Sequence, residues 1–386
     1  MSGIKKSDLV IIGAGPVGLY AGILAHLAGL DFMIVEKNER PLMHSRSAGI
    51  HPPSLKLFAR AGLIDTFLKH GIQIRRGHAR TDHETILGTL YFKDLEVHYP
   101  FILTIPQWKT EQILEQHLVE SAPGCLLRGV EIVDLKSGDG QATIYTESND
   151  GEHLIIESQL IMACDGKKSP SRYMAGIPFT GKAYPHRYVM GDFPDQTNFS
   201  TDAVIYLSRQ GLVESFPLPN GLRRWVVQQE KRREYHISDI FGLTDAIHRR
   251  CGIMPDPDRC LMYSEFGVER NLADTFWRDR LILAGDAAHV VSPIGGQGMN
   301  LGWLTAADAI TEIKNVLDEK LKIEEAAKSY DRTARKRAWK VIRRSEWNMA
   351  LGNRKRVPLI RNYIVKILLN SPLSQLLKTR FTMQGL

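Results

Sequence analysis

Residues 9–18 read LVIIGAGPVG, in which four consecutive apolar residues are followed by glycines in the spacing Gly13-x-Gly15-x-x-Gly18. The apolar run predicts a buried strand, and the apolar residues after Gly18 predict a buried helix. In such a turn Gly13 allows the tight bend, Gly15 lets the backbone approach a pyrophosphate, and Gly18 lets the helix pack close to the strand. The N-terminus of the helix adds unpaired N–H groups and a positive dipole end, which favour an anion.

A second apolar strand, which ends in Glu36, follows the predicted helix. A carboxylate at this position can accept hydrogen bonds from both hydroxyls of an adenosine ribose and would repel a 2′-phosphate. We therefore predict that the glycine turn, Glu36 and the adjacent Lys37 bind the ADP half of FAD or NAD.

Residues 9–30 contain no charged residue and follow Lys5 and Lys6, so hydropathy alone leaves a signal peptide or a membrane span open. We favour the strand, turn and helix because the glycines stand where a phosphate-binding turn needs them and because Pro16 fits poorly in the middle of a span. No other stretch is long and apolar enough to cross a bilayer.

The composition is that of a globular protein. The 386 residues are 43% hydrophobic and 24% charged, which excludes disordered and collagen-like chains. The four cysteines have no CxxC spacing, so neither a zinc site nor a disulfide framework is indicated. We expect no metal and a reducing, cytoplasmic location.

A second motif runs from Asp165-Gly166 through Ser169 to Arg172, directly after a strand-like segment. On its own it is also typical of an Asp-Gly turn followed by a capped helix, which occurs in any fold.

A third motif follows a short predicted strand at residues 281–283 and contains Gly285-Asp286, then Pro293, and a glycine-rich turn into a helix near Met299. A carboxylate such as Asp286 suits the hydroxyls of a ribityl chain. A helix N-terminus supplies the positive potential that a reduced flavin requires.

The order and spacing of these motifs, GxGxxG, DGxxSxxR and GD with a proline seven residues later, resemble those of the single-component flavoprotein aromatic hydroxylases of the para-hydroxybenzoate hydroxylase type. The resemblance spans roughly residues 7–345. It implies an FAD-dependent monooxygenase that uses NAD(P)H and O₂ to hydroxylate a phenolic, polyketide or quinone-precursor substrate through a C4a-hydroperoxyflavin. The expected substrate is a small apolar aromatic or polyene molecule.

The resemblance also assigns roles to residues. Arg46 is similar to the family arginine that contacts and steadies the flavin, and Pro293 is expected to line its substrate side. These two residues are the catalytic candidates, and no general base is identified. The other residues expected to bind the cofactor are Gly13, Gly15, Gly18, Glu36, Lys37, Gln107, Asp165, Asp286, Gly298, Met299 and Asn300.

The implied fold class is α/β, with a Rossmann-like FAD-binding domain of the GR2 type, an inserted antiparallel β-sheet substrate domain and a helical C-terminal tail. We expect the FAD-binding domain to be discontinuous, over residues 1–80, 100–180 and 270–345. The β-rich substrate domain is expected over residues 81–99 and 182–268. Alternating strands at 203–207, 211–216 and 224–228 predict hairpins that cover the flavin. No second dinucleotide fingerprint occurs, which fits enzymes in which NAD(P)H visits the flavin without a domain of its own.

Residues 346–386 form a basic tail, and no acidic residue follows Glu346 although the whole chain has a net charge of only +7. Ile360, Ile364, Ile367 and Leu368 form an apolar helical stripe. A basic amphipathic helix predicts contact with the inner face of a membrane, and it loosely resembles the C-termini of ubiquinone-pathway hydroxylases. Packing of the tail on the acidic body of this protein is the open alternative. Nothing in the sequence indicates binding to nucleic acid or an oligomeric state.

Three rival functions share these motifs. A flavin halogenase is disfavoured because no Trp-x-Trp-x-Ile-Pro segment occurs. A flavin-linked reductase of isoprenoid chains remains open. A non-catalytic lipid-binding relative is disfavoured because it would not need to keep the segment from Asp286 to Pro293.

Overall fold

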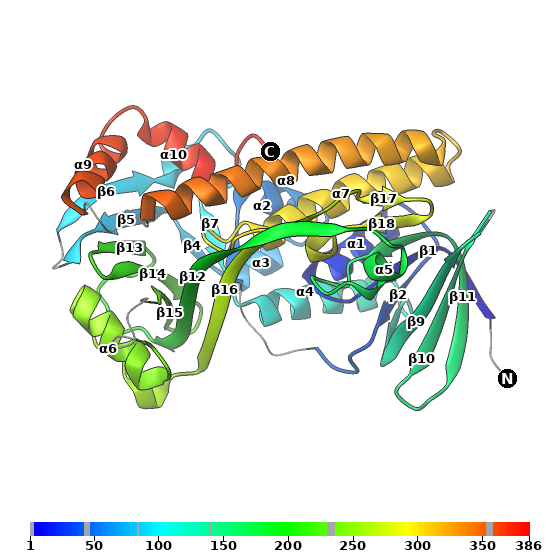
Figure 1. Ribbon diagram of the computed structural model, residues 1–386, viewed down its shortest axis with the longest axis horizontal. Helices are drawn as coiled ribbons and strands as arrows, with labels where there is room; N and C mark the ends of the chain where they lie inside the picture. Colours follow the sequence, from blue (N-terminus) through cyan, green and yellow to red (C-terminus); the bar gives the residue numbers. More distant parts are fainter. Residues whose placement is uncertain (1–3, 42–46, 83–84, 139, 230–235, 353–357) are drawn as a thin grey trace.

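The computed structural model describes residues 4–41, 47–82, 85–138, 140–229, 236–352 and 358–386. Figure 1 shows two lobes, each built around a sheet, with a long helix running across both. This helix is α8 (Ile323–Gly352), which continues from α7 (Gly298–Leu317) after a short turn.

The first lobe has a parallel sheet in which β1 (Ile4–Ile12) lies at the centre. It pairs with β2 (Phe32–Glu36) on one side and β11 (His153–Ala163) on the other. Leu9 to Ile12 are buried on both faces of the sheet, as the apolar run predicts. The sheet is completed by the parallel strands β8 (Leu126–Arg128) and β18 (Leu281–Leu283) and by the antiparallel strands β9 (Val130–Ser137), β10 (Ala142–Ser148) and β17 (Trp277–Arg278).

Helices cover this sheet. The helix α1 (Pro16–Leu27) follows β1 and packs between α4 (Gln107–Ser121) and α7. Residues 9–30 are therefore a strand, a turn and a helix, which confirms our choice over a membrane span. In the described ranges, no helix combines the length and the hydropathy that a bilayer span requires.

The second lobe contains an eight-stranded, mostly antiparallel sheet. Its hairpins β13 (Ala203–Ser208), β14 (Gly211–Leu218) and β15 (Leu222–Gln228) confirm the three predicted strands. The other strands of this sheet are β5 (Arg76–Arg80), β6 (Ile86–Tyr91), β12 (Phe179–Pro194), β16 (Met262–Ala273) and β19 (His289–Val290). The long strands β12 and β16 run along the middle of the molecule and connect the two lobes (Figure 1).

Smaller elements fill the junction between the lobes. A three-stranded sheet contains β3 (Gly49–Ile50), β4 (Ile72–Ile74) and β7 (Ile102–Thr104). The outer face of the second sheet packs against α6 (Ile240–Cys251). The remaining short helices are α2 (Pro52–Arg60), α3 (Ile64–His70) and α5 (Pro170–Met174).

The C-terminal tail packs on the second sheet as α9 (Pro358–Leu369) and α10 (Ser374–Phe381), both of which contact β6. The side of α9 that faces the protein matches the predicted apolar stripe only in part, because Ile364 and Leu368 are half-buried and the other two residues are exposed. Arg361 is buried and donates hydrogen bonds to the carbonyl oxygens of Leu207 and Ser208 at the end of β13, whereas Ile360 and Ile367 are exposed. The buried side of α9 thus combines a guanidinium that caps strand carbonyls with the apolar side chains of Val365 and Leu369.

Candidate functional site

A cavity of about 630 Å³ lies where the two sheets and the tail meet. One end is lined by the turns of the first lobe, from the glycine turn to the start of α7. The other end is a chamber roofed by the second sheet. Residues lining the first end are Gly15, Pro16, Val17, Cys164, Gly166, Asp286, Pro293, Gly298 and Met299.

The glycine turn has the geometry that the sequence predicts. Gly13 adopts φ +99°, a left-handed conformation that favours glycine. A Cβ atom on Gly18 would lie 1.9 Å from the carbonyl oxygen of Gly13, so only glycine lets α1 start this close to β1. A Cβ atom on Gly15 would meet open space, and Gly15 lines the cavity. The turn thus presents bare backbone and the uncapped N-terminus of α1 to whatever occupies this end.

Glu36 is held beside this turn at the end of β2. Its Oε2 atom accepts a hydrogen bond from the backbone N–H of Ala14 at 2.7 Å, and its Oε1 atom accepts one from Asn38. A carboxylate has further lone pairs and can accept ribose hydroxyls as well. The Nζ atom of the neighbouring Lys37 lies 3.8 Å from Glu131 on the exposed surface, and neither Glu36 nor Lys37 is among the residues that line the cavity.

The DGxxSxxR segment, residues 165–172, connects two loops through hydrogen bonds. Ser169 caps α5 by accepting a hydrogen bond from the N–H of Arg172, and Asp165 accepts one from the N–H of Ser171. The buried guanidinium of Arg172 donates to the carbonyl of Ala287 at 2.8 Å, which joins this segment to the Gly285-Asp286 turn. Burial raises the pKa of Asp165, whose Oδ1 atom has no hydrogen-bond partner among the described residues.

Asp286 faces the cavity from the turn after β18. Protein surrounds this side chain, but its carboxylate is accessible through the cavity, and it has no hydrogen-bond partner in the described part of the chain. Desolvation raises the pKa of Asp286 to about 6, against which Lys167 acts weakly. The carboxylate therefore lacks a donor that a bound molecule could supply.

The start of α7 completes this end of the cavity. Gly298 and Met299 line it, and Gln297 provides no side-chain cap to the first N–H groups. Asn300 has a different place from its neighbours. Its buried side chain accepts a hydrogen bond from the N–H of His51 and donates to the carbonyl of Gly49, so it fastens α7 to β3.

Gln107 and Pro293 are two further predicted residues that line the cavity. Gln107, the first residue of α4, lines the cavity and donates a hydrogen bond to Glu111 at 2.9 Å. Arg46 lies outside the described residues, although the adjacent Ser47 lines the cavity. Pro293 lines it from the loop before α7.

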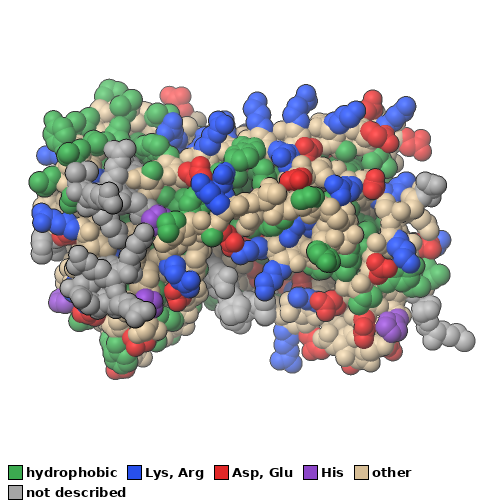
Figure 2. Space-filling view, in the orientation of Figure 1, with side chains coloured by type: hydrophobic (Ala, Val, Ile, Leu, Met, Phe, Trp, Pro, Cys, Tyr) green, Lys and Arg blue, Asp and Glu red, His purple; other side chains and the backbone are tan. Residues whose placement is uncertain are grey.

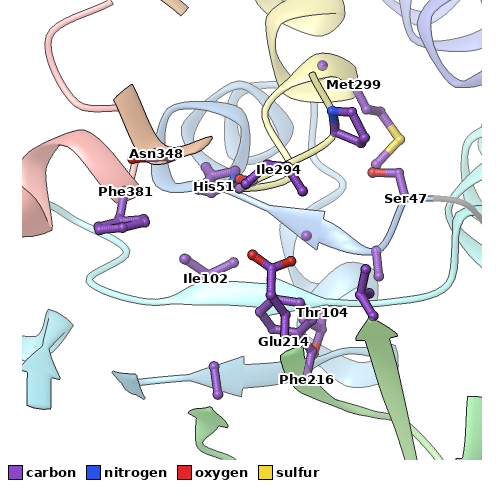
Figure 3. A pocket seen from close by; sticks show the side chains of 18 of the residues that line it. Ser47, His51, Ile102, Thr104, Glu214, Phe216, Ile294, Met299, Asn348 and Phe381 are labelled. Atoms are coloured by element: carbon purple, nitrogen blue, oxygen red, sulfur yellow. The ribbon is translucent and has the colours of Figure 1, made fainter. Parts of the chain in front are cut away.

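The chamber at the other end is apolar and has walls from three sources. The second sheet contributes its inner face, the small sheet contributes Ile74 and Ile102, and the C-terminal tail contributes the rest. Figure 3 shows Phe381 of α10 at one side of this chamber, opposite the end where Met299 lies. The tail residues that line the chamber are Val365, Leu368, Leu369, Leu377 and Phe381. The tail therefore forms one wall of the binding site.

One charged residue of the chamber escaped the sequence analysis. Glu214 on β14 is only 7% exposed, and Figure 3 shows its carboxylate pointing into the cavity. Burial raises its pKa to about 7. The signal was present in the alternation of Leu212, Glu214 and Phe216, which places a carboxylate on the same face as two apolar side chains.

The first end of the cavity fits FAD. Gly15 leaves backbone open for a pyrophosphate, Asp286 offers an unpartnered acceptor for a ribityl hydroxyl, and α7 starts with uncapped N–H groups. Adjoining this end, the apolar chamber leaves room for a second molecule.

Comparison with known proteins agrees with this fit. Residues 6–345 match the family described as FAD binding domain. The chain is 31% identical over 321 residues to an uncharacterized aromatic compound monooxygenase, YhjG, of Bacillus subtilis, covering 79% of this chain and 62% of that protein. It is 30% identical over 303 residues to a rifampicin monooxygenase of Streptomyces venezuelae, covering 76% of this chain and 61% of the relative. The chain thus spans about three fifths of the length of the curated relatives it matches.

Solved structures share the fold. The p-nitrophenol 4-monooxygenase PnpA of Pseudomonas putida superposes with a TM-score of 0.87 at 20% identity and covers 99% of both chains. The anhydrotetracycline hydroxylase OxyS of Streptomyces rimosus superposes with a TM-score of 0.81 at 23% identity, over 99% of this chain and 76% of that one.

Proposed function

The chain belongs to the FAD binding domain family, and from this premise we propose that it is an FAD-dependent monooxygenase that uses NAD(P)H and O₂ to hydroxylate an apolar aromatic substrate. One observation carries the proposal. The three loops that hold Gly15, Gly166 and Asp286 come from distant parts of the chain and line one cavity, and that cavity continues into an apolar chamber.

Bound FAD would supply the redox chemistry, by taking a hydride from NAD(P)H and activating O₂ once it is reduced. The residues of this chain bind the cofactor, orient the substrate and exclude water. The glycine turn and Glu36 would hold the ADP half, Asp286 would hold the ribityl chain, and the N-terminus of α7 would supply positive potential to the flavin ring. The apolar chamber orients the substrate ring and keeps water away from the reaction.

The arrangement also supports NAD(P)H as a visiting co-substrate. The sequence contains a single GxGxxG fingerprint, and under this proposal that turn binds FAD. No second fingerprint is left for a nicotinamide dinucleotide. Cys164 and Gly166, on either side of Asp165, line the cavity near that turn, which suits a path for the nicotinamide.

Purified full-length protein tests the proposal. We expect a yellow protein with a flavin spectrum, NADPH or NADH oxidation that rises when a phenol or polycyclic aromatic compound is added, and a product one oxygen atom heavier by mass spectrometry. A chain that takes up no FAD would contradict the proposal. FAD uptake with reduction of an isoprenoid double bond, and no oxygen consumption, would favour a reductase.

We also propose that the outer side of α9 contacts an anionic membrane surface. Leu359, Ile360, Tyr363 and Ile367 are exposed, at 74, 58, 67 and 47% respectively. Figure 2 shows hydrophobic side chains gathered over this end of the molecule and Lys and Arg side chains along α8 beside it. Apolar side chains flanked by cations are the combination that anionic lipid surfaces bind.

Point substitutions test this contact better than truncation, because removing α9 would open the chamber wall. The Ile360→Ser/Ile367→Ser variant should lose flotation with phosphatidylserine vesicles. The control Phe241→Ser removes an equally exposed side chain, 65% accessible, from α6. Equal flotation of both variants and the unaltered protein would exclude α9 as the contact.

A further inference from the structure

Glu214 lies at the centre of the roof of the chamber. In the sheet register it stands opposite Ile205 of β13 and Val226 of β15, and all three line the cavity. The side chains directly opposite it on the two neighbouring strands are therefore apolar. No hydrogen bond or ion pair joins the Glu214 carboxylate to any other described residue, although only 7% of this residue is exposed.

The other charged or ionisable groups that line the cavity have partners or belong to the cofactor end. Arg224 makes a two-point ion pair with Asp192, at 2.7 and 2.8 Å. His78 bonds to Asp202 and to Thr89. Burial lowers the pKa of His51 to about 4, so His51 is neutral, and Asp286 faces the opposite end. The uncompensated charge in the described chamber is therefore negative.

We propose that Glu214 is the substrate anchor: its carboxylate accepts a hydrogen bond from a hydroxyl group on the aromatic ring system and excludes substrates that carry a carboxylate. The inference rests on the proposed function and narrows its substrate class to phenols without an acidic side chain. Glu214 touches the substrate in this proposal, and the surrounding apolar side chains hold the ring.

The physical argument concerns pairing. A carboxylate buried in an apolar chamber loses hydrogen bonds to water, and without a protein donor it forms no hydrogen bond in exchange. A phenolic hydroxyl restores one charge-assisted hydrogen bond, which is among the stronger hydrogen bonds in proteins. A ring with a methoxy group gives no donor, and an aromatic acid brings a second negative charge into the same space. A site built on a buried polar group discriminates most strongly against ligands that leave that group unpaired.

Equilibrium dialysis of the FAD-loaded full chain, without NAD(P)H and at pH 8, tests the inference with three ligands that share one ring system. These are 2-naphthol, 2-methoxynaphthalene and 2-naphthoate. We expect the unaltered protein to bind 2-naphthol about tenfold more tightly than either of the others. Glu214→Leu should lose the preference for 2-naphthol over 2-methoxynaphthalene, and Glu214→Gln should bind 2-naphthoate about tenfold more tightly than the unaltered protein does.

Glu265→Gln is the control, because replacing this exposed carboxylate, on β16 of the same sheet, should change none of the three affinities. If Glu214 had a purely structural role, its replacement would change the stability of the protein but not the ratio of the affinities for 2-naphthol and the other two ligands. An unchanged ratio in both variants, tightest binding of 2-naphthoate by the unaltered protein, or no binding of any of the three would overturn the inference. Dialysis needs no turnover, so an inactive protein that still prefers 2-naphthol would contradict the proposed function alone.

Discussion

Replacing Glu214 with glutamine removes a buried carboxyl group and should stabilise the folded protein at alkaline pH. Burial raises the pKa of Glu214 from its ordinary value of 4.5 to about 7 in the folded state. Burial of Glu214 therefore costs no ionisation energy below pH 4.5, where the group is protonated in both states. The folded protein loses stability as the pH rises from there through 7, because ionisation then favours the unfolded chain. At pH 8 the cost of keeping the carboxylate buried amounts to about 3 kcal/mol, whereas at pH 5 it stays under about 1 kcal/mol.

Thermal denaturation of the FAD-loaded protein between pH 5 and pH 8 measures this difference. The Glu214→Gln variant should melt several degrees above the unaltered protein at pH 8, and the gap should close toward pH 5. The exposed Glu265→Gln variant serves as the matched control and should follow the unaltered protein at every pH. A gain that is equal at pH 5 and pH 8, or a loss at pH 8, would refute the reasoning from burial.

Four other substitutions test the glycine turn, the cofactor end of the cavity and the docking of α9. Gly18→Ala places a Cβ atom against the carbonyl of Gly13 and should lower stability by about 1–3 kcal/mol. Gly15→Ala meets open space and should lower FAD affinity with little change in melting temperature. The opposite pattern would contradict the assigned geometry of the turn. Asp286→Ala should weaken FAD retention about tenfold by flavin-fluorescence titration, since it removes an acceptor that faces the cavity; unchanged retention would remove its role. Arg361→Met removes the guanidinium that donates to the carbonyls of Leu207 and Ser208 and should speed proteolysis of α9, and equal digestion rates would show that other contacts hold this helix.

Keeping an unpaired carboxylate in an apolar chamber costs stability, and that cost has a functional reason under our inference. Proteins commonly retain destabilising groups where binding requires them. The stability measurement and the ligand measurement on Glu214 are independent, because the first concerns the empty chamber and the second concerns its occupant.

The sequence alone was sufficient for the local features of the first lobe. The strand, glycine turn and helix of residues 9–30 follow from apolar runs and from steric limits on φ, both of which act over a few residues. The hairpins from β13 to β15 follow from alternation and turn residues in the same way. The order of the three motifs was enough to predict the fold and the cofactor family.

The tertiary structure decided which side chains face the site. Ile360 and Ile367 of the apolar stripe predicted for α9 are exposed, because the buried side of that helix is formed by Val365, Leu369 and Arg361, which caps a strand end. Arg172 joins two loops that are more than a hundred residues apart, and Glu214 becomes an unpaired charge only when the sheet and the tail close the chamber around it. Periodicity and turn chemistry depend on neighbours along the chain, whereas burial and charge pairing depend on segments that meet only in the folded protein.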